Sequence, residues 1–385
     1  MRWTAESLVD DVLLLPDDTE TASVCHEHTI PAFVEDQIEQ RYGSLFSALP
    51  HLRQTGKLGT TTSTYVQHKD GEVQTLLLFN RDGRRVNVLN ELICLSREET
   101  ATFAAFVFAR YPPVSTISLN AVSTDLARLR YPSQRYFCSE DIVIAPLSDL
   151  ADYTQRLKKS TRKSIRRHGN ALLRAWPSAT FNVLSAQAIT APLIRQIIGF
   201  NKARMANKER VSAYTETESE WIVAMARARG VAITVTIDGR LCGGAVCCNI
   251  GGRFFLLVTA HDPEFDQFGL GMLCSHRVVS ECIARGATEV HLLWGRLPYK
   301  TDLGGVPRRF DRITIYRSHA AWLRSIDKAM LAAITGLAQE LRLWLMNAEG
   351  QPGVQGRFAS LLWRCARRAK HATKSGVSMI RRMAA

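Results

Sequence analysis

A glycine-containing loop before a predicted helix is the first feature of this sequence that could do chemistry. It reads Asp266-Gln267-Phe268-Gly269-Leu270-Gly271 and precedes an apolar helical pattern that ends near Arg285. Glycine lets backbone N–H groups approach an anion closely, and the start of a helix adds a favourable dipole. The loop is therefore a candidate phosphate site. The alternative interpretation is a tight turn that needs positive φ.

Two further groups of residues could transfer a proton or bind a metal. His261 and Asp262 end the predicted strand before the loop and could deprotonate an amine, although Asp262-Pro263 is also a common turn. Cys25-His26-Glu27-His28 resembles half of a zinc site. No second pair of ligands follows at zinc spacing, so we expect no metal.

The elements around the loop repeat one order along the chain, which is three antiparallel strands, a helix and a further strand. The predicted first copy has strands over 61–69, 73–79 and 85–92, a helix opened by a Ser96–Glu99 capping box, and a strand over 115–119. The predicted second copy has strands over 231–237, 241–249 and 254–260, a helix over 271–285 and a strand over 289–294. We therefore expect two related halves.

Composition limits the class of protein. The 385 residues are 46% hydrophobic and 22% charged, which is ordinary for a globular chain. The nine cysteines are odd in number and partly lie in apolar runs, which is typical of reduced core thiols. No apolar run reaches the roughly 20 residues of a membrane span, and residues 1–11 lack the layout of a secretory signal. We expect a cytoplasmic protein.

Charge is distributed unevenly. Residues 1–150 carry 13 Lys/Arg and 20 Asp/Glu, a net charge of −7, whereas residues 151–385 carry 36 and 16, a net charge of +20. Segment 156–174 holds eight basic residues and no acid, and so does segment 357–385, which follows a long amphipathic stretch over 319–346. These segments could hold an anionic acceptor, touch an anionic membrane surface, or form solvated faces.

Several motifs in order make residues 153–316 resemble a known family. They are Leu157–Lys163 with Ile165-Arg166-Arg167, then Asn201–Arg204, Ile237-Asp238-Gly239, Phe268–Gly271 and, most specifically, Gly295-Arg296-Leu297-Pro298-Tyr299-Lys300. The stretch resembles the GNAT-superfamily branch represented by the cellulose-biosynthesis CelD-like acetyltransferases. That branch is similar to the FemAB-like transferases, which use tandem GNAT folds. Asp266 differs from the family, which usually has Gln or Arg there.

The resemblance implies an N-acyltransferase that uses acetyl-CoA or another acyl-CoA, without a metal, on an amine of an envelope polysaccharide or lipid-linked precursor. It implies a proton donor to the leaving thiolate at Tyr299, charge stabilisation at Lys300, and oxyanion donors on the strand near Val258. The implied catalytic residues are Tyr299, Lys300, Asp262 and His261. Those implied to contact CoA are Gly269, Leu270, Gly271, Met272, Val258 and Ala260. Those implied to bind the acceptor are Arg162, Arg166 and Arg204.

The first copy serves as an internal comparison. Its helix opens with Ser96-Arg97-Glu98-Glu99, which has two carboxylates and no glycine. These charges suit the helix dipole and would repel a pyrophosphate, so any CoA site should lie in the second copy.

Two alternatives to this function stay open. A FemAB-like transferase charged by aminoacyl-tRNA would also need basic surface. A non-catalytic protein that binds nucleic acid or membrane through segments 156–174 and 357–385 is the other, although no helix-turn-helix, zinc finger or RNA-binding aromatic motif is evident.

The predicted fold class is α+β, with tandem GNAT-like halves, mixed and largely antiparallel sheets, and basic C-terminal helices. We predict a degenerate N-terminal half over 1–150, a CoA-binding half over 151–318, and amphipathic and basic helices over 319–385. We also expect the protein to be cytoplasmic, with peripheral attachment to the inner face of the membrane through 357–385.

Overall fold

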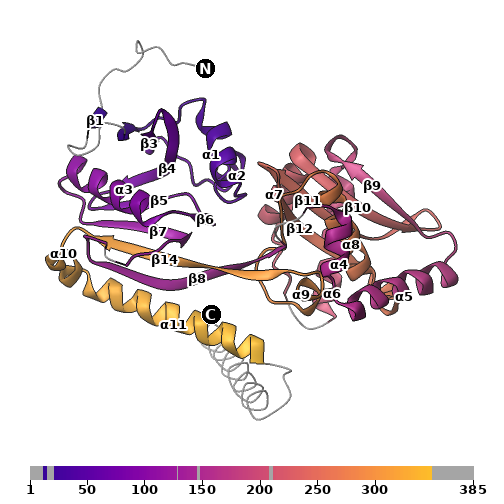
Figure 1. The fold of residues 1–385 in the computed structure, drawn as a ribbon. Coiled ribbons are helices and arrows are strands. Elements are labelled where there is room, and N and C mark those ends of the chain that lie inside the picture. The colour runs from indigo at the N-terminus through magenta and orange to yellow at the C-terminus, as the bar shows by residue number, and fades with distance from the viewer. Residues whose placement is uncertain (1–11, 15–20, 128, 145–147, 208–210, 349–385) are drawn as a thin grey trace, which may run out of the picture.

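The structure, a computed structural model, describes residues 12–14, 21–127, 129–144, 148–207 and 211–348 (Figure 1). The first half contains β1 (Val12–Leu14), β2 (Thr21–His26), α1 (Val34–Tyr42), α2 (Leu49–Gln54), β3 (Thr62–Lys69), β4 (Glu72–Asp82), β5 (Arg85–Val88), β6 (Ile93–Cys94), α3 (Arg97–Arg110), β7 (Thr116–Ser123) and β8 (Ser133–Ile144).

The second half contains α4 (Leu150–Arg156), α5 (Lys159–Ala175), β9 (Thr180–Ser185), η2 (Ala186–Ala188), α6 (Ala191–Ala206), α7 (Glu216–Arg229), β10 (Gly230–Ile237), β11 (Arg240–Ile250), β12 (Arg253–His261), η3 (Pro263–Phe268), α8 (Leu270–Ala284), β13 (Glu289–His291), α9 (Pro298–Asp302) and β14 (Val306–Tyr316). Two helices follow, α10 (His319–Arg324) and α11 (Ile326–Ala348).

The repeated element order predicted from the sequence is confirmed. In the first half β3, β4 and β5 are antiparallel, and β5 pairs in parallel with β7 after α3 has crossed between them. In the second half β10, β11 and β12 are antiparallel, and β12 pairs in parallel with β13 after α8. The α+β class with two GNAT-like halves therefore holds.

The two halves exchange strands. β8 is the last strand of the first half but pairs with β13 of the second, whereas β14 is the last strand of the second half but pairs with β7 of the first. β8 and β14 also pair with each other, so the path β1-β2-β3-β4-β5-β7-β14-β8-β13-β12-β11-β10-β9 forms one sheet, with β6 beside β7. Figure 1 shows β8 and β14 running together from one half to the other.

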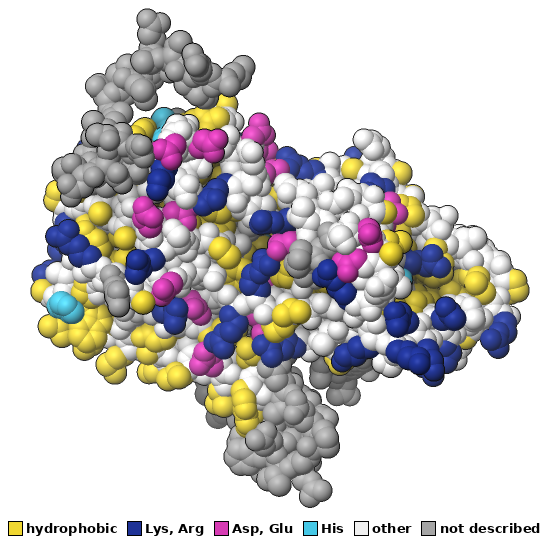
Figure 2. Space-filling model, viewed as in Figure 1, with side chains coloured by type: hydrophobic (Ala, Val, Ile, Leu, Met, Phe, Trp, Pro, Cys, Tyr) yellow, Lys and Arg dark blue, Asp and Glu magenta, His cyan; other side chains and the backbone are white. Residues whose placement is uncertain are grey.

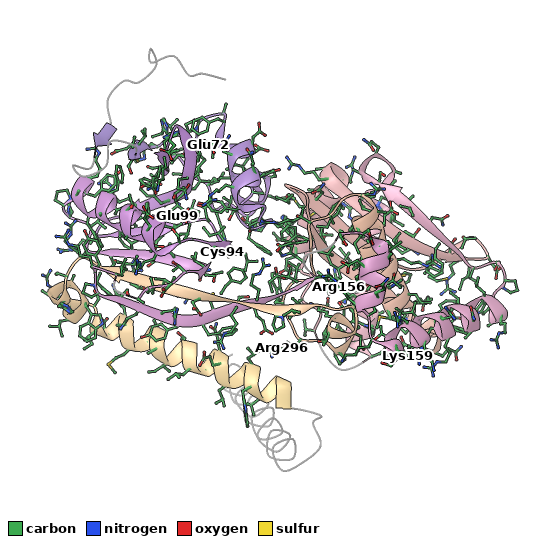
Figure 3. All side chains as sticks on the ribbon, viewed as in Figure 1. Glu72, Cys94, Glu99, Arg156, Lys159 and Arg296 are labelled. Carbon is green, nitrogen blue, oxygen red and sulfur yellow. The ribbon has the colours of Figure 1, made fainter. Side chains whose placement is uncertain are left out.

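Buried charged groups fix this junction. His291 of β13 lies 2.5 Å from Asp141 of β8 and 3.1 Å from Glu289, and burial works against the charged imidazole. The two carboxylates outweigh burial and raise the pKa of His291. Arg296, which Figure 3 labels, donates to the buried carboxylate of Glu140 on β8 at 2.8–2.9 Å. The loop before α9 is thereby held against the first half's last strand.

Helices cover both faces of the second half's sheet. One core joins α8, α4 and α5 to alternate residues of β10, β11 and β12. The other joins α6 and α7 to the opposite residues, and it also includes Leu45, Phe46 and Ala48 from the first half. The first half therefore packs directly on the face of the sheet that carries α6 and α7.

The start of α3 shows why the first copy differs from the second. Ser96 Oγ accepts from the backbone N–H of Glu99, and the Glu99 carboxylate accepts from the N–H of Ser96 at 2.6 Å. Arg41 also donates to Glu99 at 2.7 Å. The predicted capping box is thus confirmed, and a carboxylate occupies the anion position at this helix start.

The basic segment 156–174 is two helices rather than one. α4 ends at Arg156, and α5 begins at Lys159 after buried Leu157. The Lys and Arg side chains of α5 are exposed, and Figure 2 shows the cluster that they form. The predicted stretch 319–346 is likewise two helices, α10 and α11, separated at Ser325.

Other expectations differ from the structure in detail. The predicted strand 85–92 ends at Val88, and the strand 289–294 ends at His291. Cys25 contacts the Tyr111 hydroxyl at 3.6 Å, and Glu27 pairs with Arg110. No helix among the described residues is long and apolar enough to cross a bilayer. Segment 357–385 lies outside the described residues, and the domain limits at 150 and 318 stay predictions.

Candidate functional site

β12 and β13 separate after a short parallel pairing. Their register ends at Phe255 opposite His291. The next residues of the β13 chain stay with β8 instead, because Leu292 donates to the Ile142 carbonyl at 2.7 Å and Ile142 donates to the Leu293 carbonyl at 3.2 Å. The edge of β12 is therefore free of β13 beyond Phe255, and the sheet opens there.

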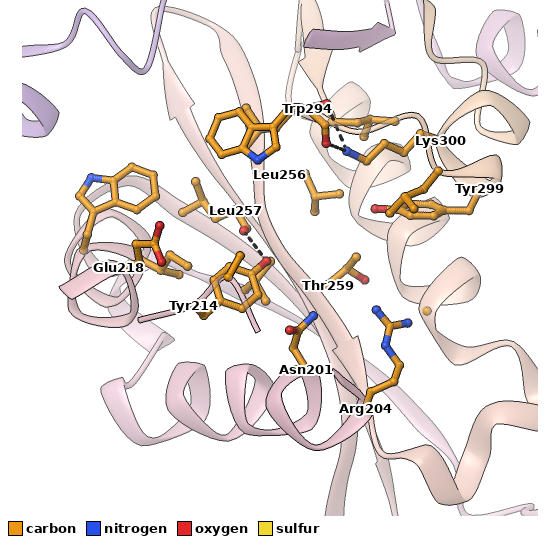
Figure 4. Close-up of a pocket in the computed structure, with 18 of the residues that line it drawn as sticks. Asn201, Arg204, Tyr214, Glu218, Leu256, Leu257, Thr259, Trp294, Tyr299 and Lys300 are labelled. Carbon is orange, nitrogen blue, oxygen red and sulfur yellow. Dashed lines mark hydrogen bonds between the residues drawn. The ribbon is translucent and has the colours of Figure 1, made fainter. Parts of the chain in front are cut away.

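A β-bulge lies on β12 at this opening. Val258 pairs with Val246 and Leu256 pairs with Cys247, so Leu257 has no partner of its own on β11. The Leu257 carbonyl accepts a hydrogen bond from the Tyr214 hydroxyl at 3.3 Å (Figure 4). The bulge therefore changes the direction of the β12 backbone within the opening.

A cavity of about 610 Å³ fills the opening and is lined largely by apolar side chains. Eight of the thirteen site residues predicted from the sequence line it. They are Val258, His261, Gly269, Gly271, Met272, Tyr299, Lys300 and Arg204. Residues from β12, α6, α8 and α9 thus meet around one space.

The other five predicted residues lie elsewhere. Leu270 and Ala260 are core residues. Asp262 pairs with Arg240 and accepts from the backbone N–H of Glu264 at 3.1 Å, so it forms the turn that was the alternative interpretation. Arg162 and Arg166 are exposed on α5 and do not line the cavity.

Two glycines at the start of α8 lie so close to histidine side chains that a larger residue would collide with them. Gly269 has φ of 59°, and a Cβ there would lie 2.4 Å from Nδ1 of His168 on α5. A Cβ on Gly271 would lie 3.2 Å from Nδ1 of His261. Each glycine thus lets an imidazole approach the helix start. The N–H groups of Gly269 and Met272 donate to the carbonyls of Asp266 and Gly269, which leaves those of Leu270 and Gly271 as the candidate donors to an anion.

His261 and Asp266 form a pair at the edge of the cavity. His261 Nε2 lies 2.7 Å from Asp266 Oδ1, and Nδ1 of His261 has no partner among the described residues. Burial, opposed by Asp266, lowers the pKa of His261. The imidazole is therefore neutral at pH 7 and able to accept a proton.

Lys300 is a buried ammonium, with 5% of the residue exposed. Its Nζ donates to the Leu293 carbonyl at 3.1 Å and to the Trp294 carbonyl at 2.7 Å (Figure 4). Burial lowers the pKa of Lys300 to about 8, although Asp141 and Glu140 work in the opposite direction. The lysine thus secures the strand that has left β12 and brings a positive charge to the cavity.

Two tyrosines line the cavity, Tyr299 beside Lys300 and Tyr214 beside Leu257 (Figure 4). Burial raises the pKa of Tyr299, and it raises the pKa of Tyr214 to about 12. Both phenols are therefore protonated at neutral pH, so each has a proton that it can donate.

Arg204 points into the cavity from α6, on the same side as Tyr299 (Figure 4). Its Nε is buried without a hydrogen-bond partner among the residues that the structure describes. Such a guanidinium is a ready site for a carboxylate or phosphate.

The sequence prediction did not include the residues that the first half contributes. Phe46, His51, Gln54 and Thr55 line the cavity opposite β12. These residues are far from the glycine loop in the sequence, so no local pattern indicated that they line the same cavity. Trp221, Glu218 and Trp294 complete that wall and were also missed as site residues.

Comparisons with known proteins agree with this geometry. Residues 159–301 match the family model described as an acetyltransferase (GNAT) domain. The structure is similar to the crystal structure of FemX, with a TM-score of 0.54 and 11% identity over 77% of this chain and 99% of that chain. It is also similar to a conserved protein of unknown function from Bacteroides thetaiotaomicron VPI-5482, with a TM-score of 0.51 and 12% identity over 75% of this chain and 98% of that one. A search of curated proteins found no match.

The match to the acetyltransferase (GNAT) domain therefore lies within the second half, over the residues that form α5 to α9. Over the matched part of the chain the fold is similar to that of FemX, and the described residues form two GNAT-like halves.

Proposed function

We propose that this protein is an N-acyltransferase that takes its acyl group from an acyl-CoA bound in the second half. The observation that carries the proposal is the opening between β12 and β13, which contains a bulge at Leu257 and leads to the glycine start of α8. A pantetheine arm laid along the free edge of β12 would have its phosphates at that helix start.

Residues of the cavity can supply each proton transfer. The amine of the acceptor attacks the thioester carbonyl, forming the C–N bond, and His261 takes the proton that the nitrogen loses. Backbone N–H groups near Val258 and the Lys300 ammonium stabilise the oxyanion. The C–S bond then breaks, and Tyr299 protonates the departing thiolate.

The acceptor is an amine on an envelope polysaccharide or lipid-linked precursor. Its anionic group would pair with Arg204, whose Nε is buried without a hydrogen-bond partner among the described residues. The exposed arginines of α5, Arg162 and Arg166 among them, add a positive surface beside the glycine loop.

Calorimetric titration with acetyl-CoA tests the donor site. We expect one molecule to bind per chain, and Gly271→Trp to weaken binding at least about tenfold, because its side chain would meet His261 and enter the cavity. Gly199→Trp is the matched control, since Gly199 also lies inside a helix without positive φ but has open space around it. Equal binding by wild type and a folded Gly271→Trp would contradict the proposed site.

An aminoacyl-tRNA donor is the second candidate. The basic exposed face of α5 beside α8 favours it, because tRNA binding needs positive surface. In that case acetyl-CoA would not bind at millimolar concentration, and a transfer reaction in cell extract would be lost on treatment with ribonuclease.

We also propose that α11 attaches the protein to the inner face of an anionic membrane. α11 packs on β8 through Gly336, where a Cβ would lie 2.7 Å from Tyr136. Its opposite face is an exposed apolar row of Met330, Leu331, Ile334, Leu337, Leu341 and Trp344. The chain continues into segment 357–385, which carries eight basic residues and no acid. An apolar helix face next to basic residues is typical of interfacial binding.

A further inference from the structure

The cavity continues past the bulge on β12 into an apolar end. This acyl end is formed by Phe46, Trp221, Leu256, Leu293 and Trp294. The Phe46 ring lies 5.5 Å from Trp294 and 5.1 Å from His51, and His51 lies 5.4 Å from Trp221. Trp294 is 58% exposed although it borders a cavity, which leaves apolar surface free for a ligand.

Charged groups at the acyl end are already engaged or neutral. Burial, aided by Lys57, lowers the pKa of His51 to about 4, so the ring is uncharged at pH 7. Glu218 accepts from the backbone N–H of Thr215 at 2.9 Å and caps α7. Lys300 donates to two carbonyls. His51 Nδ1 and Trp221 Nε1 are buried without a partner among the described residues, but the rest of the end consists of apolar rings and aliphatic side chains, so it is suited to an uncharged, largely apolar group.

The position of the acyl end relative to the thioester decides which group would occupy it. If the phosphates lie at Gly269 and the thioester carbonyl lies at the bulge, the transferred group extends further along β12, toward Leu256 and Trp294. An acetyl group is too short to reach those rings, since it has one carbon beyond the carbonyl. Figure 4 shows Trp294 and Leu256 close to Lys300, at the other end of the drawn cavity from Arg204.

We propose that the transferred acyl group carries an apolar chain of several carbons, and that the first half selects it through Phe46. This inference rests on the proposed acyl-CoA site. Each methylene buried between these rings should tighten binding about fourfold until the end is filled. The first half would then help to determine which acyl group is transferred.

The test is calorimetric titration of the full chain with acetyl-, butanoyl-, hexanoyl- and octanoyl-CoA. We expect octanoyl-CoA to bind at least about 100-fold more tightly than acetyl-CoA. Phe46→Ala and Trp294→Ala should each reduce that ratio at least about tenfold, whereas Leu323→Ala, an exposed apolar residue on α10, should leave it unchanged. The ratio is measured within each variant, so a general loss of affinity does not affect it.

Equal affinity across the series would overturn this inference and leave the acyl-CoA site intact. The same holds for a chain-length preference that Phe46→Ala or Trp294→Ala does not change. Absence of binding by every acyl-CoA would overturn the proposed function and the inference with it.

Discussion

At the scale of single residues, Lys300 is the group whose chemistry is most constrained by its surroundings. It is buried, yet its Nζ remains at the cavity and is held by the Leu293 and Trp294 carbonyls. A pKa of about 8 means that the ammonium is the main form at pH 7 and is lost as the pH rises through 8. An oxyanion stabiliser in this position would therefore fail in mildly alkaline solution.

We predict that Lys300→Met lowers kcat by about 100-fold or more, the usual effect of removing one oxyanion donor. Wild-type activity should decline above pH 8, whereas Lys300→Arg should be slower but show no decline near pH 8, because a guanidinium stays charged. The measurement is kcat against pH with a saturating acyl-CoA. Full activity of Lys300→Met would remove Lys300 from the mechanism.

Stability supplies the control for that experiment. The folded state lowers the pKa of Lys300, so the protonated lysine disfavours folding at every pH below about 8, and this penalty declines as the pH rises above 8. Lys300→Met removes the penalty together with two hydrogen bonds. We therefore expect the variant to stay folded at pH 7, which separates loss of catalysis from loss of structure.

At the scale of elements, α11 has one face that the fold uses and one that it leaves exposed. The residues of the exposed apolar row are between 43% and 65% exposed. We predict that the protein sediments with vesicles that contain anionic lipid. Replacing Ile334, Leu337 and Leu341 by Gln should weaken this binding at least about tenfold.

The control replaces three other exposed apolar residues by Gln, namely Leu150, Leu173 and Val183 in the second half. It should bind vesicles as the wild type does. If both triple variants bind equally, or if the wild type does not bind, α11 is not a membrane surface.

The elements also show how far sequence reasoning reached. The hairpins at Asp70-Gly71 and Asp238-Gly239 and the capping box at Ser96 are local signals, and the structure confirms them. β8 and β14 were not predicted as strands. They pair with each other across the two halves, and no local sequence pattern indicates such a pairing. The glycine loop was found because it needs close backbone approach, whereas Phe46 and Trp294 were missed because only tertiary packing brings them to the cavity.

At the scale of the whole molecule, the exchange of β8 and β14 makes the two halves one structure. β8 holds the strand that leaves β12, through Ile142, and it holds the loop before α9 through Glu140. The first half thus helps to keep the second half's sheet open. The two halves also differ where an anion would bind. α8 of the second half begins with glycines, whereas α3 of the first half begins with a capping carboxylate, so the two helix starts can be compared directly.

Hydrogen–deuterium exchange of the full chain, with and without saturating acetyl-CoA, makes that comparison. We predict slower exchange over 256–261 and 268–273, which are the free edge of β12 and the start of α8. We predict no change over 96–100, where Glu99 caps α3. Protection confined to the first half, or no change anywhere at saturation, would contradict the claim that the second half binds the acyl donor.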